Sequence, residues 1–405
     1  MSKAYQMTGS ICLSCGIAGV TTLIDFGPQP PSNRFAPRGS SPSMDSHVLR
    51  LGQCNSCGLV QLVDPMPASM VRSHHSWLTY NEPEGHLDTL VRHLTQLVGT
   101  DASIHGLTYK DDSTLARFNR HGYGRTYRYD MQSDLGVDDA RAGLETVQSI
   151  IDEVLVNNLV RKHGTADLLI VRHLLEHAHA PTQFLRALSG LLAPGGKLVL
   201  EVPDCRKFIN ACDYSFIWEE HISYFSPQSI ERFASHNRFS AIETQVFPYP
   251  LEDSLVVVMQ PSKDDFAPTD DVDLEHELDA NQRFGGRFEV IRQRYRTHLE
   301  SLRLSGQRVA VFGAGHLAVK FLNLFDLKDC VDCVIDDNPH KQGLVMPGSG
   351  LAIVGSSKLQ EIDLCLLALS PESEQKIFTK QQGYIQGGGR FASIFALSPL
   401  AIGIV

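Results

Sequence analysis

The chain lacks a long apolar run, a signal-type leader and an excess of basic residues. No stretch approaches the ~18–20 consecutive apolar residues that a membrane-spanning helix needs. The N-terminus, MSKAYQMTGS, has no apolar segment of the signal-peptide kind. The formal net charge is −10, and non-specific binding to nucleic acid needs a basic surface instead. These absences predict a soluble, cytoplasmic protein with no nucleic-acid or membrane partner.

Cysteine is scarce, with nine residues in 405, but four of them form two close pairs. The paired residues are Cys12, Cys15, Cys54 and Cys57. In a reducing cytosol such C-x-x-C pairs indicate metal rather than disulfides. A glycine follows each pair (Gly16 and Gly58) and allows the backbone to turn tightly. Four thiolates form the closed tetrahedral shell of a structural zinc ion, so the pairs predict one such site.

The five other cysteines lack this arrangement. Cys330 and Cys333 repeat the C-x-x-C spacing, but they flank an expected strand and have no second pair. We therefore expect them to be core thiols.

Composition and periodicity divide the chain into five regions. They are a loop-rich zinc-binding module (1–70), a helical connector (71–98), a Rossmann-like domain (99–260), an acidic linker with a charged helix (261–304) and a second Rossmann-like domain (305–405). Short apolar runs alternate with amphipathic stretches in both larger regions, as in βα units. The glycine pair at 285–286 predicts a break in the charged helix. The expected fold class is α/β, with an N-terminal zinc-binding module and two Rossmann-like three-layer domains.

The last region has the layout of a nucleotide-binding βαβ unit. An apolar strand from Arg308 enters the glycine turn that ends at Gly315, and an acidic pair beginning at Asp336 follows the next strand. The third glycine of the usual fingerprint is absent, so the pattern favours the fold more than a bound dinucleotide. Lys320 on the intervening helix is placed to meet a phosphate or to lie in solvent.

Two segments of the middle region carry candidate catalytic residues. The strand from Asp167 ends at His173 and leads to His177, at the edge where open α/β sheets place their sites. A second segment, IWEEHISYF, sets Glu220 beside His221, a pair suited to general-base chemistry. A packed aromatic loop with solvated carboxylates explains the second segment equally well.

The order of motifs resembles one family. The two cysteine pairs, RHLLEHAHAPTQFLRALSGLLAPGGKLVLEVPD, WEEHISYFSPQSIERF and FGAGHLAVKF…VIDDNPHKQGLVMPGSGLAI stand in the same order in the deoxysugar C-methyltransferases. The resemblance covers nearly the whole chain. It implies structural zinc, a Rossmann-like domain that binds S-adenosylmethionine, and a C-terminal substrate-binding domain. The implied substrate is a small molecule, a nucleotide-linked keto sugar.

The resemblance also implies catalytic roles. An enolate forms when a base removes the proton next to the ketone, and the enolate then takes the methyl group. His221 matches the base, Glu220 is its neighbour and His177 lines the pocket. Tyr80 falls where the family has a pair of tyrosines closing the site, and Trp77 stands at the first position of that pair.

The chain departs from the family at the cofactor loop. The motif E-x-G-x-x-x-G is replaced by SIHGLTYKDDSTL, in which Lys110 would crowd and repel a sulfonium cofactor. The candidate cofactor-binding residues are Gly106, Tyr109, Lys110, Asp111, Asp112, Asp130 and His173. Three outcomes therefore stay open: altered binding of S-adenosylmethionine with methyl transfer, cofactor-free proton chemistry such as epimerisation or elimination, and a silent ligand-binding homologue. The oligomeric state cannot be derived from the sequence.

Overall fold

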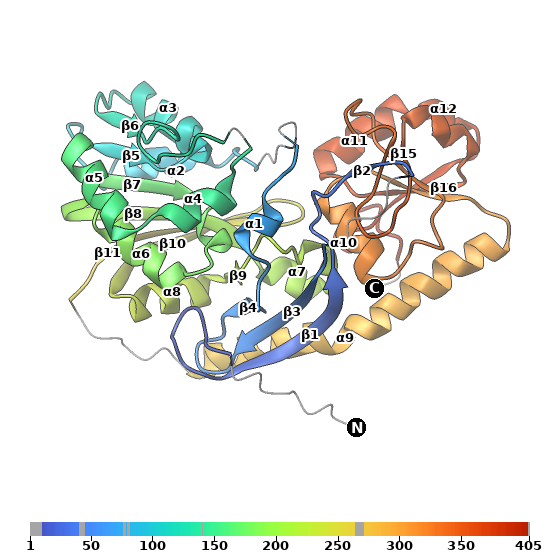
Figure 1. Cartoon of the computed structure of the whole chain (residues 1–405), viewed down its shortest axis with the longest axis horizontal. Helices are drawn as coiled ribbons and strands as arrows, with labels where there is room; N and C mark the ends of the chain where they lie inside the picture. The colour runs from blue at the N-terminus through green and yellow to red at the C-terminus, as the bar shows by residue number, and fades with distance from the viewer. Residues whose placement is uncertain are drawn as a thin grey trace.

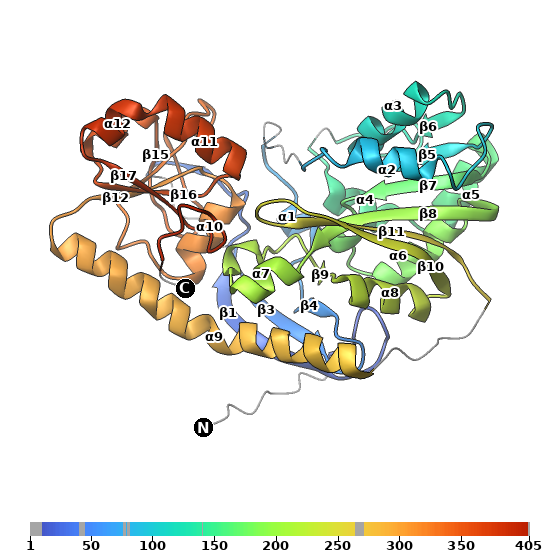
Figure 2. The ribbon, with the colours of Figure 1, turned by 180° about the vertical axis from the view of Figure 1, so that it is seen from behind.

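The computed structural model describes residues 10–39, 45–75, 78, 82–139, 141–263 and 271–403. Figure 1 shows two lobes, joined below by the strands of a small N-terminal sheet and by one long helix. The view from behind in Figure 2 shows the long helix running beneath both lobes. The predicted fold class, a small N-terminal module with two α/β domains, is confirmed. None of the described helices is both long and apolar enough to cross a membrane.

The N-terminal module is richer in strands than its loop-like composition predicts. Its antiparallel sheet has the order β1-β3-β4-β9, formed by Val20–Gln29, His47–Cys54, Val60–Val63 and Ser223–Tyr224. The last strand comes from the middle domain. A separate two-stranded ribbon pairs β2 (Ala36–Pro37) with β14 (Leu344–Val345) of the C-terminal domain. Both larger domains therefore complete the pairing of N-terminal strands.

Two short helices occur in the described residues at and after the predicted start of the helical connector. The first, α1 (Ala68–Val71), follows the N-terminal sheet, and the second, α2 (Leu87–Leu94), packs on the middle domain. The apolar residues of α2 recur on one face and are all buried, as an amphipathic surface helix requires. Trp77 and Tyr80 lie outside the described residues.

The middle domain is built on a six-stranded sheet of order β10-β11-β8-β7-β5-β6. The four parallel strands are β5 (Ile104–Gly106), β6 (Thr126–Arg128), β7 (Ala166–Arg172) and β8 (Leu192–Asp204). The antiparallel pair β10 (Phe239–Phe247) and β11 (Asp253–Pro261) extends the sheet. The helices are α3 (Asp112–Arg120), α4 (Leu144–Ile150), α5 (Glu153–His163), α6 (Pro181–Ser189), α7 (Arg206–Ala211) and α8 (Pro227–His236). The carboxyl ends of β5, β6 and β7 therefore meet at one edge.

The long helix α9 (Asp271–Leu304) runs through Gly285 and Gly286 without a break, so the predicted interruption is wrong. Packing explains the glycine at position 285. A Cβ atom there would lie 2.8 Å from the carbonyl oxygen of Leu23 in β1, so glycine lets the helix approach the sheet. Nothing lies within 4 Å of a Cβ at Gly286.

The C-terminal domain has a parallel five-stranded sheet of order β15-β13-β12-β16-β17. Its strands are β12 (Val309–Phe312), β13 (Cys333–Ile335), β15 (Ile353–Val354), β16 (Leu364–Leu367) and β17 (Arg390–Ser393). Its helices are α10 (His316–Leu324), α11 (Pro371–Lys380) and α12 (Gln382–Gln386). Cys330 and Cys333 are buried in its core, where core thiols are expected.

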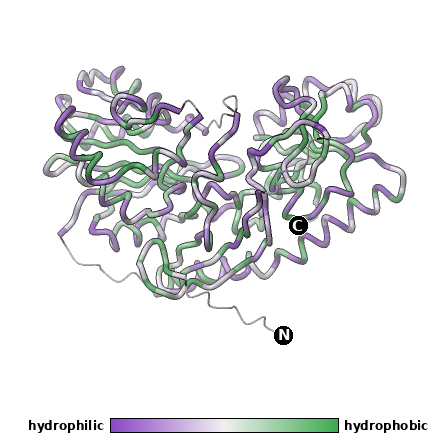
Figure 3. Tube along the Cα trace, in the orientation of Figure 1, coloured by the Kyte–Doolittle hydropathy of each residue, from purple (hydrophilic) through white to green (hydrophobic). Residues whose placement is uncertain are grey.

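Hydrophobic residues concentrate along the central strands of both lobes, as the coloured trace of Figure 3 shows. An aromatic cluster joins the parts. The ring of Tyr214 from the middle domain stacks on Phe284 of α9 with centroids 4.4 Å apart, and its edge meets Phe325 of the C-terminal domain at 6.1 Å. Buried aromatic contacts of this kind stabilise an interface beyond the area they bury. The cluster therefore holds the lobes together around α9.

Candidate active site and zinc site

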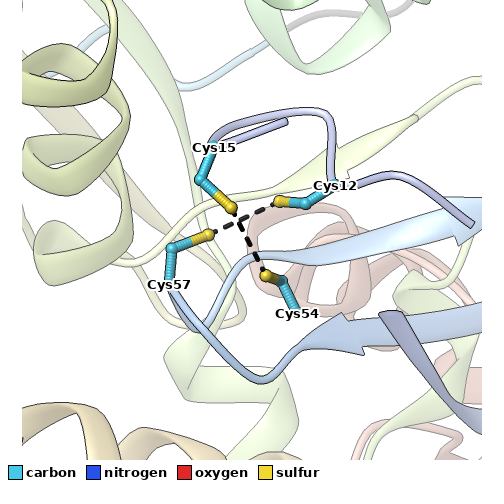
Figure 4. A group of neighbouring side chains, drawn as sticks. All are labelled: Cys12, Cys15, Cys54 and Cys57. Carbon is cyan, nitrogen blue, oxygen red and sulfur yellow. Dashed lines mark hydrogen bonds between the residues drawn. The ribbon is translucent and has the colours of Figure 1, made fainter. Parts of the chain in front are cut away.

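The four paired cysteines converge at one end of the N-terminal sheet (Figure 4). The sulfur atoms of Cys12 and Cys57 are 3.5 Å apart, and those of Cys15 and Cys54 are 3.6 Å apart. A tetrahedron of sulfurs around zinc, with Zn–S bonds of about 2.3 Å, has edges of about 3.8 Å. The donor set therefore matches a closed zinc–thiolate shell.

The local chemistry also fits zinc. Hydrogen bonds among the thiols, together with burial, raise the pKa of Cys57 well above the usual thiol range, whereas the same kind of bonds lower the pKa of Cys54. A divalent cation offsets the mutual repulsion of four ionised sulfurs and so allows all four to bind as thiolates. Gly16 and Gly58 have φ values of 71° and 73°, so each turn uses the left-handed region that favours glycine. The predicted structural zinc site is thus supported by geometry and by chemistry.

A second site lies in a cavity of about 520 Å³ beside the carboxyl ends of β5 and β7. Its wall draws on the N-terminal module, the connector and the middle domain. The polar and aromatic side chains in the wall include Asn33, Glu82, Tyr109, Lys110, Glu145, His177, Trp218, Glu220 and His221. The cavity thus collects three predicted catalytic residues and two predicted cofactor residues.

Two imidazoles stand together in this wall. The rings of His177 and His221 lie 4.9 Å apart at 83°. Burial lowers the pKa of each ring to about 3, so both are neutral at physiological pH. The backbone N–H of Ile222 donates to the carbonyl of Glu176 at 2.6 Å and so ties the two segments together. Each ring therefore offers a lone pair in a defined position.

Glu220 has a different electrostatic environment. Its carboxyl group is held among two other acids, Glu219 and Glu145, and Asn33 donates to it at 3.4 Å. Burial, followed by repulsion from Glu219 and Glu145, raises the pKa of Glu220 well above its usual range. The raised pKa favours the protonated form of this carboxyl group, which can donate a hydrogen bond.

A buried ionic network lies under the cavity. Arg172, with 1% of its side chain exposed, pairs with Glu201, which also accepts from His173 at 3.1 Å. Burial alone would lower the pKa of His173, but Glu82 and Glu201 outweigh it and raise the pKa to about 10. His173 is therefore a charged structural member of the network, at a left-handed φ of 51°. This arrangement places it beneath the cavity rather than in its wall.

The loop after β5 shows why the usual glycine-rich motif is missing. The carboxylate of Asp111 is fully buried and accepts from the backbone N–H groups of Leu107 and Thr108, each at 2.8 Å. Its other oxygen accepts from the backbone of Arg172 at 2.9 Å. A Cβ at Gly106 would lie 2.8 Å from that of Asp111. Asp111 thus holds the loop from inside, and Gly106 makes room for it.

The other predicted cofactor residues have varied surroundings. The ammonium group of Lys110 is 3.3 Å from Glu82, and Tyr109 lies next to it in the cavity wall. Asp112 is exposed and pairs with Arg128 at 2.7 Å. Asp130 follows β6 and caps the next turn by accepting from the Ser133 backbone at 2.8 Å. Only Tyr109 and Lys110 of this set therefore line the cavity.

Sequence reasoning missed the acids and amide that complete the wall, namely Asn33, Glu82 and Glu145. Asn33 belongs to the N-terminal module and Glu82 to the connector, far from the strand-end motifs along the chain. These residues come together only when the N-terminal module, the connector and the middle domain pack against one another. No pattern within a short stretch of sequence predicts this.

The glycine turn of the C-terminal domain is closed by its own residues. Asp336, expected to face a ribose, accepts from the backbone N–H of Ala314 at 2.8 Å and pairs with Lys341 at 3.1 Å. Lys320 does not meet solvent: it is fully buried and pairs with Glu219 of the middle domain. The ring of His316 stacks on Trp218 with centroids 4.3 Å apart, so this domain reaches the edge of the cavity.

Three family profiles match successive parts of the chain. They are a zinc-binding domain over residues 12–70, a methyltransferase domain over residues 84–244 and a C-methyltransferase C-terminal domain over residues 270–396. The chain is also 23% identical over 412 residues to the C-methyltransferase NovU of Streptomyces niveus, with 94% of each chain covered. These matches follow the predicted order of zinc module, central domain and C-terminal domain.

Two solved structures resemble part of the chain. One is the 1,6-didemethyltoxoflavin-N1-methyltransferase of Burkholderia thailandensis (13% identity, 56% of this chain, 100% of the other, TM-score 0.34). The other is the magnesium protoporphyrin IX methyltransferase of Synechocystis PCC 6803 (14% identity, 49% and 98%, TM-score 0.32).

Proposed function

We propose that this chain, an enzyme of the zinc-containing C-methyltransferase family, methylates a carbon next to a carbonyl group after removing a proton there. The observation that carries the proposal is a pair of neutral imidazoles, His177 buried and His221 half-buried, in a cavity that reaches the loop after β5. A carbon acid needs a base within about 3 Å and a hydrogen-bond donor for the enolate oxygen. The cavity wall supplies both types of group.

His221 is the proposed base. Its neutral ring has a lone pair available throughout the physiological pH range, because burial disfavours the charged form. The carboxylate of Glu82 opposes this effect and favours the charged ring. The same carboxylate therefore stabilises the imidazolium that forms when His221 takes the proton.

Glu220 is the proposed donor to the enolate oxygen. Because its carboxyl group is protonated, it donates where an ionised carboxylate would repel the developing negative charge. His177 completes the wall beside His221 and limits the orientations open to a substrate. His221 and Glu220 are adjacent in the chain, so one loop presents acid and base together.

The methyl donor we propose is S-adenosylmethionine, which supplies an electrophilic methyl group on a sulfonium ion. The wall at Tyr109, Lys110 and Met131 lies where the strand ends of β5 and β6 meet, and Asp130 stands beside it. Glu82 neutralises Lys110 at 3.3 Å and so removes the repulsion that the loop sequence predicts. These residues would hold the donor, although Asp111 already occupies the loop amides.

A nucleotide-linked keto sugar is the proposed substrate class. A smaller cavity of about 160 Å³ lies between the N-terminal module and the C-terminal domain, lined by Gly315, His316 and Lys341. The N-terminus of α10 and the ammonium of Lys341 suit phosphate groups. Leu78 lines both cavities, so a sugar in the larger one and its phosphates in the smaller one fit a single extended ligand.

The first experiment is calorimetric titration of the purified protein with S-adenosylmethionine and S-adenosylhomocysteine. We expect binding near micromolar concentration. An absence of heat at millimolar ligand would contradict the proposed donor and would favour cofactor-free proton chemistry in the same cavity.

A second experiment tests the base without the donor. Exchange of the α-protons of a nucleotide-linked keto sugar with solvent deuterium is followed by NMR in the wild-type protein and in His221→Asn. We expect the exchange rate to fall by ~10²–10⁴-fold in the variant. The exposed His121→Asn is the matched control and should exchange at the wild-type rate. Equal rates in all three proteins would remove His221 from the mechanism.

A further inference from the structure

A second cluster of side chains of the types that bind metal ions lies at the wall of the larger cavity. Glu176, His177 and His221 each offer one ligand atom, and these atoms all lie within 4.8 Å of one another. Glu176 and His177 belong to the one-turn helix that follows β7 (Leu175–His177), and His221 to the loop before β9. The backbone bond from Ile222 to Glu176 holds the two segments in this relation.

The carboxylate of Glu176 is buried beside one charged group, His173, but it accepts no hydrogen bond from the described residues. The residue is 2% exposed, and neither of its side-chain oxygens has a hydrogen-bond partner among the described residues. The Nδ1 atom of His177 is also buried without a hydrogen-bond partner among the described residues. Glu176 forms an ion pair with His173, whose Nδ1 lies 3.5 Å from its carboxylate, and this separation is long for a hydrogen bond. Leaving such groups unsatisfied costs free energy that a bound cation would recover.

We propose that Glu176, His177 and His221 bind a divalent transition-metal ion. Two imidazoles and one carboxylate suit Zn²⁺, Fe²⁺ or Co²⁺, whereas Mg²⁺ and Ca²⁺ prefer sites made of oxygen ligands alone. His177 and His221 line the cavity, so the remaining coordination positions face the space proposed for the substrate. The site is separate from the four-cysteine cluster, which offers only sulfur.

Metal bound here opposes the proposed reaction, and this part of the inference rests on the proposed function. A metal ion that takes the lone pair of His221 removes the proton acceptor. Excess zinc or cobalt therefore inhibits proton removal, and chelation restores it. Metal binding itself does not depend on the identity of the substrate.

The test is a cobalt titration of protein whose cysteine site is already filled with zinc. We expect one further equivalent of Co²⁺ to bind with weak visible absorption. The strong near-ultraviolet bands of thiolate–cobalt coordination should be absent. Glu176→Gln should weaken this binding by more than ~100-fold, beyond the effect of losing an outer partner. Glu145→Gln, an acid in the same cavity wall outside the ligand set, is the matched control and should bind as the wild type does.

Three results would overturn the proposal: no cobalt beyond the cysteine site, equal affinity in Glu176→Gln and wild type, or thiolate bands accompanying the added metal. The inhibitory role has its own measurement. Deuterium exchange should fall as cobalt fills the site in the wild type, and it should respond only at ~100-fold higher cobalt in Glu176→Gln. Faster exchange with metal would reject inhibition and leave the cobalt site standing. No exchange without metal would instead count against His221 as the base.

Discussion

At the scale of single residues, buried charges depend on their partners. Arg172 is 1% exposed at its side chain and pairs with Glu201 beneath the cavity. Replacing it by leucine leaves Glu201 with one positive partner fewer. We expect Arg172→Leu to lower the free energy of unfolding by ~3–5 kcal/mol in urea denaturation. Arg141→Leu removes an exposed ion pair with Asp139 and should change the free energy of unfolding by less than ~0.5 kcal/mol. Similar losses in both variants would contradict this view of the network.

Asp213 provides a pH-dependent prediction. Burial raises the pKa of Asp213 to about 7, while weak bonds from the backbone of Ser215 (3.3 Å) and Ala396 (3.4 Å) only partly oppose this. The folded protein therefore holds a proton that the unfolded chain releases near pH ~4. The contribution of Asp213 to the free energy of unfolding is fully present below pH ~4. It is lost as the pH rises to about 7, by up to ~4 kcal/mol.

The check is urea denaturation of wild type and Asp213→Asn at several pH values between 4 and 8. The variant should lose less stability across this range. Asp111, whose pKa burial also raises to about 7, contributes to the remaining slope in both proteins. Parallel slopes in the two proteins would show that Asp213 does not titrate there.

A site residue can be predicted from the sequence when its role is determined by residues close to it in the chain. The zinc-binding role of the four cysteines was predicted from spacing alone, because two C-x-x-C pairs supply four thiolates with the spacing that a tetrahedral zinc site needs. The burial of Lys320 could not be predicted, because a lysine on a helix is usually solvated. Only the packing of two domains buries it against Glu219. The same is true of Glu82 and Asn33 in the cavity wall.

At the scale of elements, α9 depends on a single close approach. A Cβ at Gly285 would press on the backbone of Leu23 in β1, whereas Gly286 faces open space. We expect Gly285→Ala to lower the free energy of unfolding by ~1–3 kcal/mol through overpacking. Gly286→Ala, one residue away, should raise it by up to ~1 kcal/mol because alanine favours helix. Thermal denaturation of the two variants checks the contrast, and a gain in both would show that the helix can shift.

The order of elements was largely predictable, but their details were not. Apolar strands followed by amphipathic helices predicted both α/β domains, because periodicity reports burial directly. The helix break at Gly285-Gly286 was predicted wrongly, because low helix propensity was weighed without the packing that selects glycine. The N-terminal strands were missed, because β1 contains Gly27 and Pro28 at a bulge and so resembles a loop.

At the scale of the whole molecule, the zinc module supports both neighbours. Arg232 of α8 donates to the carbonyl of Cys57 at 2.7 Å and also pairs with Glu277 of α9. We expect Cys54→Ser to reduce bound zinc from about one ion per chain to nearly none and to lower the melting temperature. Metal analysis of the purified variant measures this. Cys333→Ser, from the look-alike pair in the C-terminal core, should retain its zinc. Full zinc in Cys54→Ser would exclude the four-cysteine site.

The pairing of the N-terminal strands also determines when this part of the chain can complete its folding during synthesis. Strand β4 pairs with Ser223–Tyr224, and the ribbon strand β2 pairs with Leu344–Val345. A ribosome releases the N-terminus first, so β4 leaves it long before its partner exists. Through that interval the nascent chain presents an open strand edge of the kind that recruits other chains. The part of the protein that is synthesised first is therefore among the last to be completed.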